Sequence, residues 1–389
     1  MCEKVALLLL VAAQFLSAFV DNMILFVAQA ILWRDAYPTW YLQLVQATFL
    51  LSYILLSPWA GVLADRYAKR NILMAGNALK SIGVVAMLAG FDPAISYAIV
   101  GIGAVVYSPA KYGILPLLTR TDSQLLKANS QVEGFTILAI LLGAAFGGWL
   151  ADYSVPLALG SCLGLYLVSA LLCCRIPANL ADHSLAFSGA IQRFGHDLMV
   201  VLADRKGKFS LLGTSGFWMA SAVLRLSVFA WLPLAFGIHD NTTIGLMVTL
   251  SGVGLIAGAI VTPRLVPPAN YSRIILVGAL MALGLVILPW SPSLSLALLI
   301  QTITGSFGGM YVIPLNAMLQ RVGERTVGTG KAVAIQNFAE NSLMFVGVSL
   351  FLLSSWSGIP VAWSMTGNGA LLMIVICGLR YFCNDHLTE

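Results

Sequence analysis

Residues 5–32 read VALLLLVAAQFLSAFVDNMILFVAQAIL. This run is long enough to cross a bilayer as a helix, which takes about 20 apolar residues. It contains one charged residue, Asp21, and a carboxylate inside the membrane costs about 2.5–3.5 kcal/mol on insertion scales. Because chains rarely carry such a charge without a use, Asp21 is the first candidate functional residue.

The composition is that of an integral membrane protein. Of the 389 residues, 59% are hydrophobic and only 10% are charged, whereas a soluble domain carries about 25% charged residues. The apolar runs have helix length and lack the alternation of a barrel, so the chain is predicted to be all-α. Twelve transmembrane helices are expected, at residues 6–32, 40–63, 71–90, 94–118, 128–150, 155–175, 209–235, 242–264, 273–290, 294–319, 329–353 and 360–381.

Lysine and arginine collect at every second junction between the predicted helices, which marks the cytoplasmic side. The opposite side carries only Arg34, so both termini are predicted to be cytoplasmic. The net charge of +5 is then a topology signal, and no nucleic-acid partner is expected. The cytoplasmic set comprises Arg66, Lys69, Arg70, Arg120, Lys127, Arg193, Arg205, Lys206, Lys208, Arg264, Arg273, Arg321, Arg325 and Lys331.

A polar stretch at residues 177–208 separates six predicted helices from six more. We therefore expect an N-terminal half at 1–176, a cytoplasmic linker at 177–208 and a C-terminal half at 209–389. A shift of 204 residues superposes identical residues of the two halves, which indicates a duplication. Parallel halves with pseudo-two-fold symmetry are typical of the major facilitator fold. The superposed pairs are Ser17 and Ser221, Gly101 and Gly305, Tyr107 and Tyr311, Lys127 and Lys331, Ala128 and Ala332, and Gly143 and Gly347.

The loop after the second predicted helix reads GVLADRYAKR at residues 61–70 and resembles the major facilitator signature between helices 2 and 3. Gly61 would let helices approach closely, and Asp65 can meet a helix N-terminus across a cytoplasmic gate. Arg66 and Arg70 add charge pairs, so these four residues are assigned to gating. The signature differs at one position, where Ala68 replaces a second glycine.

Two charges inside predicted helices occupy equivalent positions of the repeat. Asp21 and Arg225 are 204 residues apart, and each lies about 22–24 Å from the cytoplasmic start of its helix at about 1.5 Å per residue. We expect both side chains to face one central cavity with a substrate or gating role. The alternative is a buried structural ion pair.

Four further ionisable residues fall inside predicted helices. Lys111 and Glu133 lie at similar depth on neighbouring helices, either as substrate contacts or as a structural bridge. Lys80 ranks last, because a lysine can extend its ammonium group to the interface. The fourth residue is Glu340, which lies roughly mid-membrane beside Asn337 and Asn341.

Small residues recur at helical spacing in several predicted helices. In the fifth helix Gly134, Gly143 and Gly147 resemble the glycine pattern of major facilitator drug antiporters, but the proline that normally follows is absent. Close packing against a neighbouring helix is therefore the better interpretation. The same interpretation applies to Gly254–Gly258 and Gly305–Gly309.

Several blocks along the chain resemble the bacterial lysophospholipid transporter family, from about residue 12 to residue 370. The first block is Ala13–Phe19 with Asp21 and Asn22, although Val20 stands where the family pattern has glycine. The second reads YSPAKYGIL at residues 107–115. The remaining blocks are Lys127–Asn129, Ile140–Gly143, Pro314–Ala317, Ile335–Asn337 and Glu340–Ser342.

This resemblance implies a flippase of the Gram-negative inner membrane that moves lysophosphatidylethanolamine from the outer to the inner leaflet, with other lysophospholipids as further candidate cargo. A cytoplasmic acyltransferase/acyl-acyl-carrier-protein synthetase would then restore the second acyl chain. We expect a monomer without cofactor or metal. The predicted substrate-binding residues are Asp21, Asn22, Tyr107, Lys111, Glu133, Arg225, Asn337 and Glu340.

Two other function classes remain open at this point. A proton-coupled multidrug efflux antiporter would need a carboxylate that titrates near neutral pH, and the missing proline in the fifth helix counts against it. A membrane receptor or scaffold would need no charges inside its helices. An enzyme is not expected, because the sequence shows no nucleophile–base constellation, phosphate loop or metal cluster.

Overall fold

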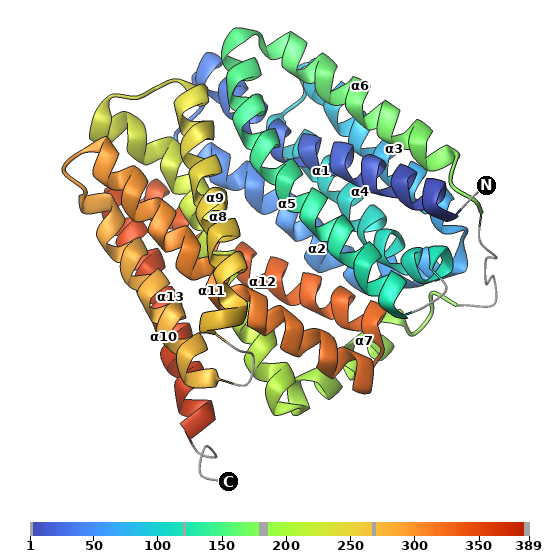
Figure 1. The fold of residues 1–389 in the computed structure, drawn as a ribbon. Helices are drawn as coiled ribbons and strands as arrows, with labels where there is room; N and C mark the ends of the chain where they lie inside the picture. The colour runs from blue at the N-terminus through green and yellow to red at the C-terminus, as the bar shows by residue number, and fades with distance from the viewer. Residues whose placement is uncertain (1–2, 120–121, 179–185, 267–269, 385–389) are drawn as a thin grey trace. The chain divides into compact units, whose positions relative to one another are not determined.

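The computed structural model describes residues 3–119, 122–178, 186–266 and 270–384, and the regular structure in these ranges is entirely helical (Figure 1). Twelve helices within them are long and apolar enough to span a membrane, as the sequence predicts. The spanning helices of the first half are α1 (Glu3–Arg34), α2 (Tyr41–Arg66), α3 (Lys69–Leu88), α4 (Pro93–Gly113), α5 (Asp122–Tyr153) and α6 (Val155–Cys174). Those of the second half are α8 (Arg205–Phe236), α9 (Asn241–Leu265), α10 (Tyr271–Ile287), α11 (Leu294–Arg325), α12 (Thr329–Trp356) and α13 (Val361–Asn384).

The helices differ from the predicted ranges mainly at polar ends. Helix α5 begins at Asp122 and α11 continues to Arg325, about one and a half turns beyond the apolar runs. Hydropathy detects only the segment that is apolar, whereas helical hydrogen bonds continue into water. The predicted linker also contains a helix that the sequence analysis did not anticipate, α7 (Ala190–Ala203).

Short polar side chains begin several of these helices. Asp204 accepts a hydrogen bond from the Gly207 amide at 2.8 Å at the start of α8, and Asp240 accepts one from the Thr243 amide at 2.7 Å at the start of α9. Each satisfies a backbone donor that the first helical turn leaves without a partner. Asp92, Ser154, Asn270 and Ser293 act in the same way on α4, α6, α10 and α11.

The chain divides into two compact units. The N-terminal unit comprises Met1–Pro38 and Leu44–His196, and the C-terminal unit comprises Thr39–Gln43 and Asp197–Glu389. The division falls inside α7, within the predicted linker. The domain limits at residues 176 and 208 stay a prediction.

The two units repeat one pattern of helix packing, which a duplication of six helices requires. In the N-terminal unit α1 packs against α5 and α6, and α3 packs against α4 and α6. In the C-terminal unit α8 packs against α12 and α13, and α10 packs against α11 and α13.

Glycines at corresponding places permit this close packing. A Cβ added at Gly76 would lie 2.8 Å from the Tyr107 Cβ, and one added at Gly278 would lie 2.7 Å from the Tyr311 ring. The two tyrosines are the pair that the 204-residue shift superposes. These contacts support the duplication independently of the sequence identities that suggested it.

Glycine packing also holds α5 against α1, as the sequence predicts for Gly143 and Gly147, whereas a Cβ at Gly134 would meet no described atom within 4 Å. A Cβ at Gly143 would collide with the Phe19 carbonyl, and one at Gly147 would lie 2.8 Å from the Met23 Cα. Gly347, the repeat counterpart of Gly143, lies against Met219 of α8 in the same way. Small residues therefore set the helix spacing in both units.

Replacing Gly258 by alanine is expected to destabilise the C-terminal unit by about 1–3 kcal/mol. The added methyl group would collide with the Ser306 carbonyl where α9 crosses α11. The melting temperature of the purified protein in detergent measures this effect. Gly367→Ala is the matched control, because a Cβ at Gly367 meets nothing within 4 Å. Equal melting temperatures for the two variants would contradict the packing argument.

Candidate functional site

The carboxylate of Asp21 is held at both oxygens inside the N-terminal unit. Lys80 of α3 donates from Nζ to Oδ2 at 2.6 Å, and Tyr166 of α6 donates its hydroxyl to Oδ1 at 2.7 Å. The Asp21 side chain is 22% exposed, whereas the Lys80 side chain is only 1% exposed. The ion pair joins α1 to α3, and the Tyr166 hydroxyl adds α6 to the same site.

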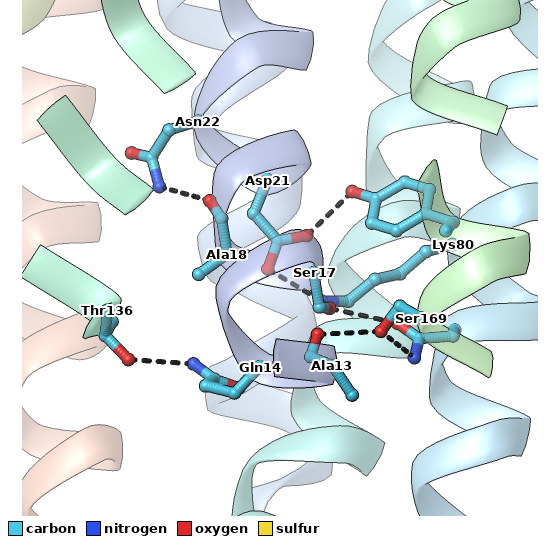
Figure 2. A network of polar contacts seen from close by, with 11 residues as sticks. Ala13, Gln14, Ser17, Ala18, Asp21, Asn22, Lys80, Thr136 and Ser169 are labelled. Atoms are coloured by element: carbon cyan, nitrogen blue, oxygen red, sulfur yellow. Dashed lines mark hydrogen bonds and ion pairs between the residues drawn. The ribbon is translucent and has the colours of Figure 1, made fainter. Parts of the chain in front are cut away.

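A chain of hydrogen bonds continues from this ion pair into the unit (Figure 2). Lys80 also donates to the Ser17 hydroxyl at 2.9 Å, and Ser17 donates to Asn77 Oδ1 at 2.9 Å. Asn77 then donates to the Ser169 hydroxyl at 2.8 Å, which donates to the Ala13 carbonyl at 2.7 Å. Ser17, Asn77 and Ser169 are fully buried. These bonds satisfy polar groups that would otherwise destabilise a buried site.

Aromatic rings surround the ammonium group of Lys80. It lies 5.1 Å from the centroid of the Tyr107 ring and 5.5 Å from that of the Tyr166 ring. Both distances are within the range at which an aromatic face attracts a cation. Tyr107, a predicted substrate-binding residue, is buried, and in this structure its ring faces the ammonium group of Lys80.

Lys80 does not behave as the sequence analysis expects. A snorkelling lysine would place its ammonium group in water, but this one is buried beside Asp21. Within the N-terminal unit, the charged partner of Asp21 is Lys80. No relative placement of the two units is described, so a shared cavity for Asp21 and Arg225 stays a prediction.

Two other predicted residues of the N-terminal unit, Asn22 and Lys111, make contacts elsewhere. Asn22 donates to the Ala18 carbonyl at 2.9 Å, one helical turn back along α1. Lys111 of α4 is 8% exposed, and its ammonium lies 4.3 Å from the centroid of the Tyr112 ring. The side chain of Glu133 lies outside the described part of the structure, so its bridge to Lys111 stays a prediction.

The C-terminal unit has a second polar group around Glu340. Gln336, one turn earlier on α12, donates from Nε2 to Glu340 Oε1 at 2.7 Å and to Asn316 Oδ1 of α11 at 2.9 Å. Glu340 is 8% exposed. The backbone carbonyl of Asn337 accepts a hydrogen bond from Asn341 at 2.7 Å. Arg225 lies on α8 and is partly buried.

The loop assigned to gating is only partly as expected. Asp65 pairs with Lys69 at 3.2 Å, and the Asp65 side chain is 65% exposed whereas that of Lys69 is 11% exposed. The Arg66 guanidinium lies 5.1 Å from the Phe187 ring centroid, and Arg70 donates to Asn71 at 3.4 Å. A Cβ at Gly61 would meet no described atom within 4 Å, so the structure shows no close approach there, and its gating role stays a prediction.

Known proteins resemble the chain over nearly its whole length. The family model of the Major Facilitator Superfamily matches residues 10–348. The Lysophospholipid transporter LplT of Enterobacter sp. (strain 638) is 40% identical over 371 residues, which cover 95% of this chain and 93% of that protein. The protein of the same name from Cronobacter sakazakii is 38% identical over 95% of this chain and 94% of its own length.

The chain belongs to the LplT family of the Major Facilitator Superfamily. With its twelve apolar helices, it is a multi-pass membrane protein. Solved structures agree with the fold. A bacterial homolog of the human lysosomal transporter Spinster has a TM-score of 0.73 at 15% identity, covering 100% of this chain and 99% of its own. The nucleoside transporter NupG has a TM-score of 0.73 at 10% identity, covering 97% and 100%.

The sequence analysis did not assign Tyr166, Asn77 and Ser169 to this site. The spacing of polar residues within three of the apolar helices could have indicated them. Ser17 and Asp21 are four residues apart, whereas Asn77 and Lys80, and Tyr166 and Ser169, are three apart. Each spacing places two polar side chains on one face of an apolar helix. Three such faces within one unit indicate a polar site where the helices meet.

Removing either partner of the ion pair is expected to destabilise the protein, and removing Asp21 is expected to cost more than removing Lys80. Asp21→Asn leaves the buried ammonium group of Lys80 without its counter-ion, which typically costs about 3–5 kcal/mol. Lys80→Met should cost less, because Asp21 keeps the Tyr166 hydroxyl and partial exposure. Melting temperatures of both variants and of the double variant test this, and the double variant should be more stable than Asp21→Asn. If the fall in melting temperature of the double variant equals the sum of the falls of the two single variants, the ion pair between Asp21 and Lys80 is contradicted.

Proposed function

We propose that this protein transports lysophospholipids by alternating access between its two units. The observation that carries the proposal is the 40% identity, over 95% of the chain, with a protein named Lysophospholipid transporter LplT. Identity at this level along both units makes a shared cargo class the simplest expectation. The polar site in the N-terminal unit supports the same conclusion.

A lysophospholipid carries an anionic phosphate and one acyl chain, and the ethanolamine form also carries an ammonium group. Asp21 is partly exposed, and a carboxylate offers about four lone-pair sites, of which Lys80 and Tyr166 use two. The remaining acceptors suit the ammonium group. Arg225 of the C-terminal unit suits the phosphate, because a guanidinium binds phosphate oxygens in a bidentate manner.

The proposed direction of transport is the one that brings the lysolipid to the leaflet where it would be reacylated. We propose that the protein acts in the Gram-negative inner membrane as a monomer, and that it moves lysophosphatidylethanolamine from the outer to the inner leaflet. There a cytoplasmic acyltransferase/acyl-acyl-carrier-protein synthetase would restore the missing acyl chain. The contacts of Asn22, Tyr107, Lys111, Glu133, Asn337 and Glu340 with the cargo are part of the same proposal, as is gating by Gly61, Asp65, Arg66 and Arg70.

Purified protein in proteoliposomes is expected to take up labelled lysophosphatidylethanolamine, but neither diacyl phosphatidylethanolamine nor a cationic drug. The expectation for the two lipids rests on the likeness to proteins named lysophospholipid transporters, and that for the drug on the proposed phosphate contact of Arg225, which a cationic drug lacks. Initial uptake rates with and without a proton gradient measure this. Protein-free liposomes supply the background rate. Uptake of the drug without uptake of the lysolipid would favour a multidrug antiporter and contradict the proposal.

Arg225→Ala is expected to lower lysolipid uptake at least about tenfold, since charge-assisted hydrogen bonds to phosphate contribute roughly 1.5–3 kcal/mol each. Arg225→Lys should restore only part of the rate, because lysine cannot bind in a bidentate manner. Arg193→Ala removes an exposed arginine of α7 and is the charge-matched control. Full-rate transport by an Arg225→Ala variant that inserts normally would exclude the assigned phosphate contact.

A further inference from the structure

Lys80 is a buried charge for which the proposed function has no task. Its ammonium group donates to Asp21 and Ser17, and the side chain is 1% exposed. A lysine so enclosed by α1, α4 and α6 cannot itself touch a lipid head group in this structure. Any effect of Lys80 on transport must therefore act through Asp21.

The helix packing around Lys80 does not require a lysine. Gly76 lies against Tyr107 in the N-terminal unit, and Gly278 lies against Tyr311 at the matching place of the C-terminal unit. Four residues after these glycines stand Lys80 in α3 and Ala282 in α10, and both are buried. The C-terminal unit thus packs the corresponding helices around Ala282 instead of a lysine. In the same unit, Arg225 stands at the repeat position of Asp21.

The charge balance of the site suggests a role for Lys80. Alone, the Asp21 carboxylate would attract an ammonium group and repel the phosphate that every phospholipid head group carries. Paired with Lys80, the site has no net charge but keeps carboxylate lone pairs that can accept from an amine. Like-charge contacts in a binding site cost several kcal/mol, so this neutralisation matters most for a cargo without an amine.

We propose that Lys80 is a positioning residue that neutralises Asp21 and so lets the site accept phospholipid head groups without an amine as well as those with one. This inference rests on the proposed function, because it names the head-group classes that the same site takes. Lys80 holds one carboxylate oxygen while Tyr166 holds the other. The amine of a zwitterionic head group then donates to a carboxylate whose negative charge Lys80 already balances.

The test compares two lysolipids that differ in head-group charge. Lysophosphatidylethanolamine carries an amine, whereas lysophosphatidylglycerol carries none and is a net anion. We would measure kcat/KM for both in proteoliposomes containing the wild-type protein, Lys80→Met, Lys80→Arg, Asp21→Asn and the double variant Asp21→Asn/Lys80→Met. The informative quantity is the ratio of the two values, because a general loss of fold lowers both values together.

Lys80→Met is expected to shift this ratio roughly tenfold toward the amine-bearing lipid, because an uncompensated carboxylate repels the anionic head group. Asp21→Asn should shift the ratio in the opposite direction, and the double variant should lie between the two. Lys80→Arg keeps the charge and should keep the wild-type ratio. Ser17→Ala removes an uncharged hydrogen bond of the same lysine and should leave the ratio unchanged, whatever its overall rate.

Three results would overturn the inference. If Lys80→Met lowers kcat/KM for both lysolipids equally, the role of the lysine is only structural. Transport of lysolipid by the wild-type protein would still support the proposed function. If Lys80→Met does not fold, an Asp21→Asn/Lys80→Met ratio equal to that of Asp21→Asn alone excludes a charge effect of Lys80. A wild-type protein that moves neither lysolipid would contradict the proposed function and this inference with it.

Discussion

The ion pair between Asp21 and Lys80 joins α1 to α3 of the N-terminal unit, the Tyr166 hydroxyl adds α6, and their polar interior is organised around this site. Charges away from water need both a counter-ion and hydrogen bonds, because neither alone offsets the loss of hydration. Lys80 supplies the counter-charge, while Tyr166, Ser17, Asn77 and Ser169 supply the hydrogen bonds. These contacts tie helices α1, α3 and α6 to one another.

The two units share a packing scheme but carry different chemistry. Glycines bring corresponding helices together in both, at Gly76 and Gly278 and at Gly143 and Gly347. At the polar positions the duplication has diverged, since an aspartate of α1 corresponds to an arginine of α8. Shape is thus common to both halves, whereas the charged residues at this repeat position differ in sign.

Much of the fold could be predicted because its signals are local. Each apolar run marks its own helix, and only polar ends such as those of α5 and α11 extended further than hydropathy indicates. The prediction for Lys80 failed for a different reason. A lysine inside an apolar run can extend to water or meet an anion, and nothing within its own helix distinguishes these outcomes. The packing at Gly61 could not be read from the sequence either, because whether a glycine has a close neighbour depends on another helix.

The sequence by itself determined the membrane helices, their division into two related sets of six, and the depth of each charge along its helix, because hydropathy and periodicity depend on adjacent residues. Only the tertiary structure decided which charges meet. Lys80 is 59 positions from Asp21, and Tyr166 is 145 positions from it. Such partners are chosen by helix packing, in which glycines set the spacing and the low-dielectric interior requires each buried charge to find its counter-ion.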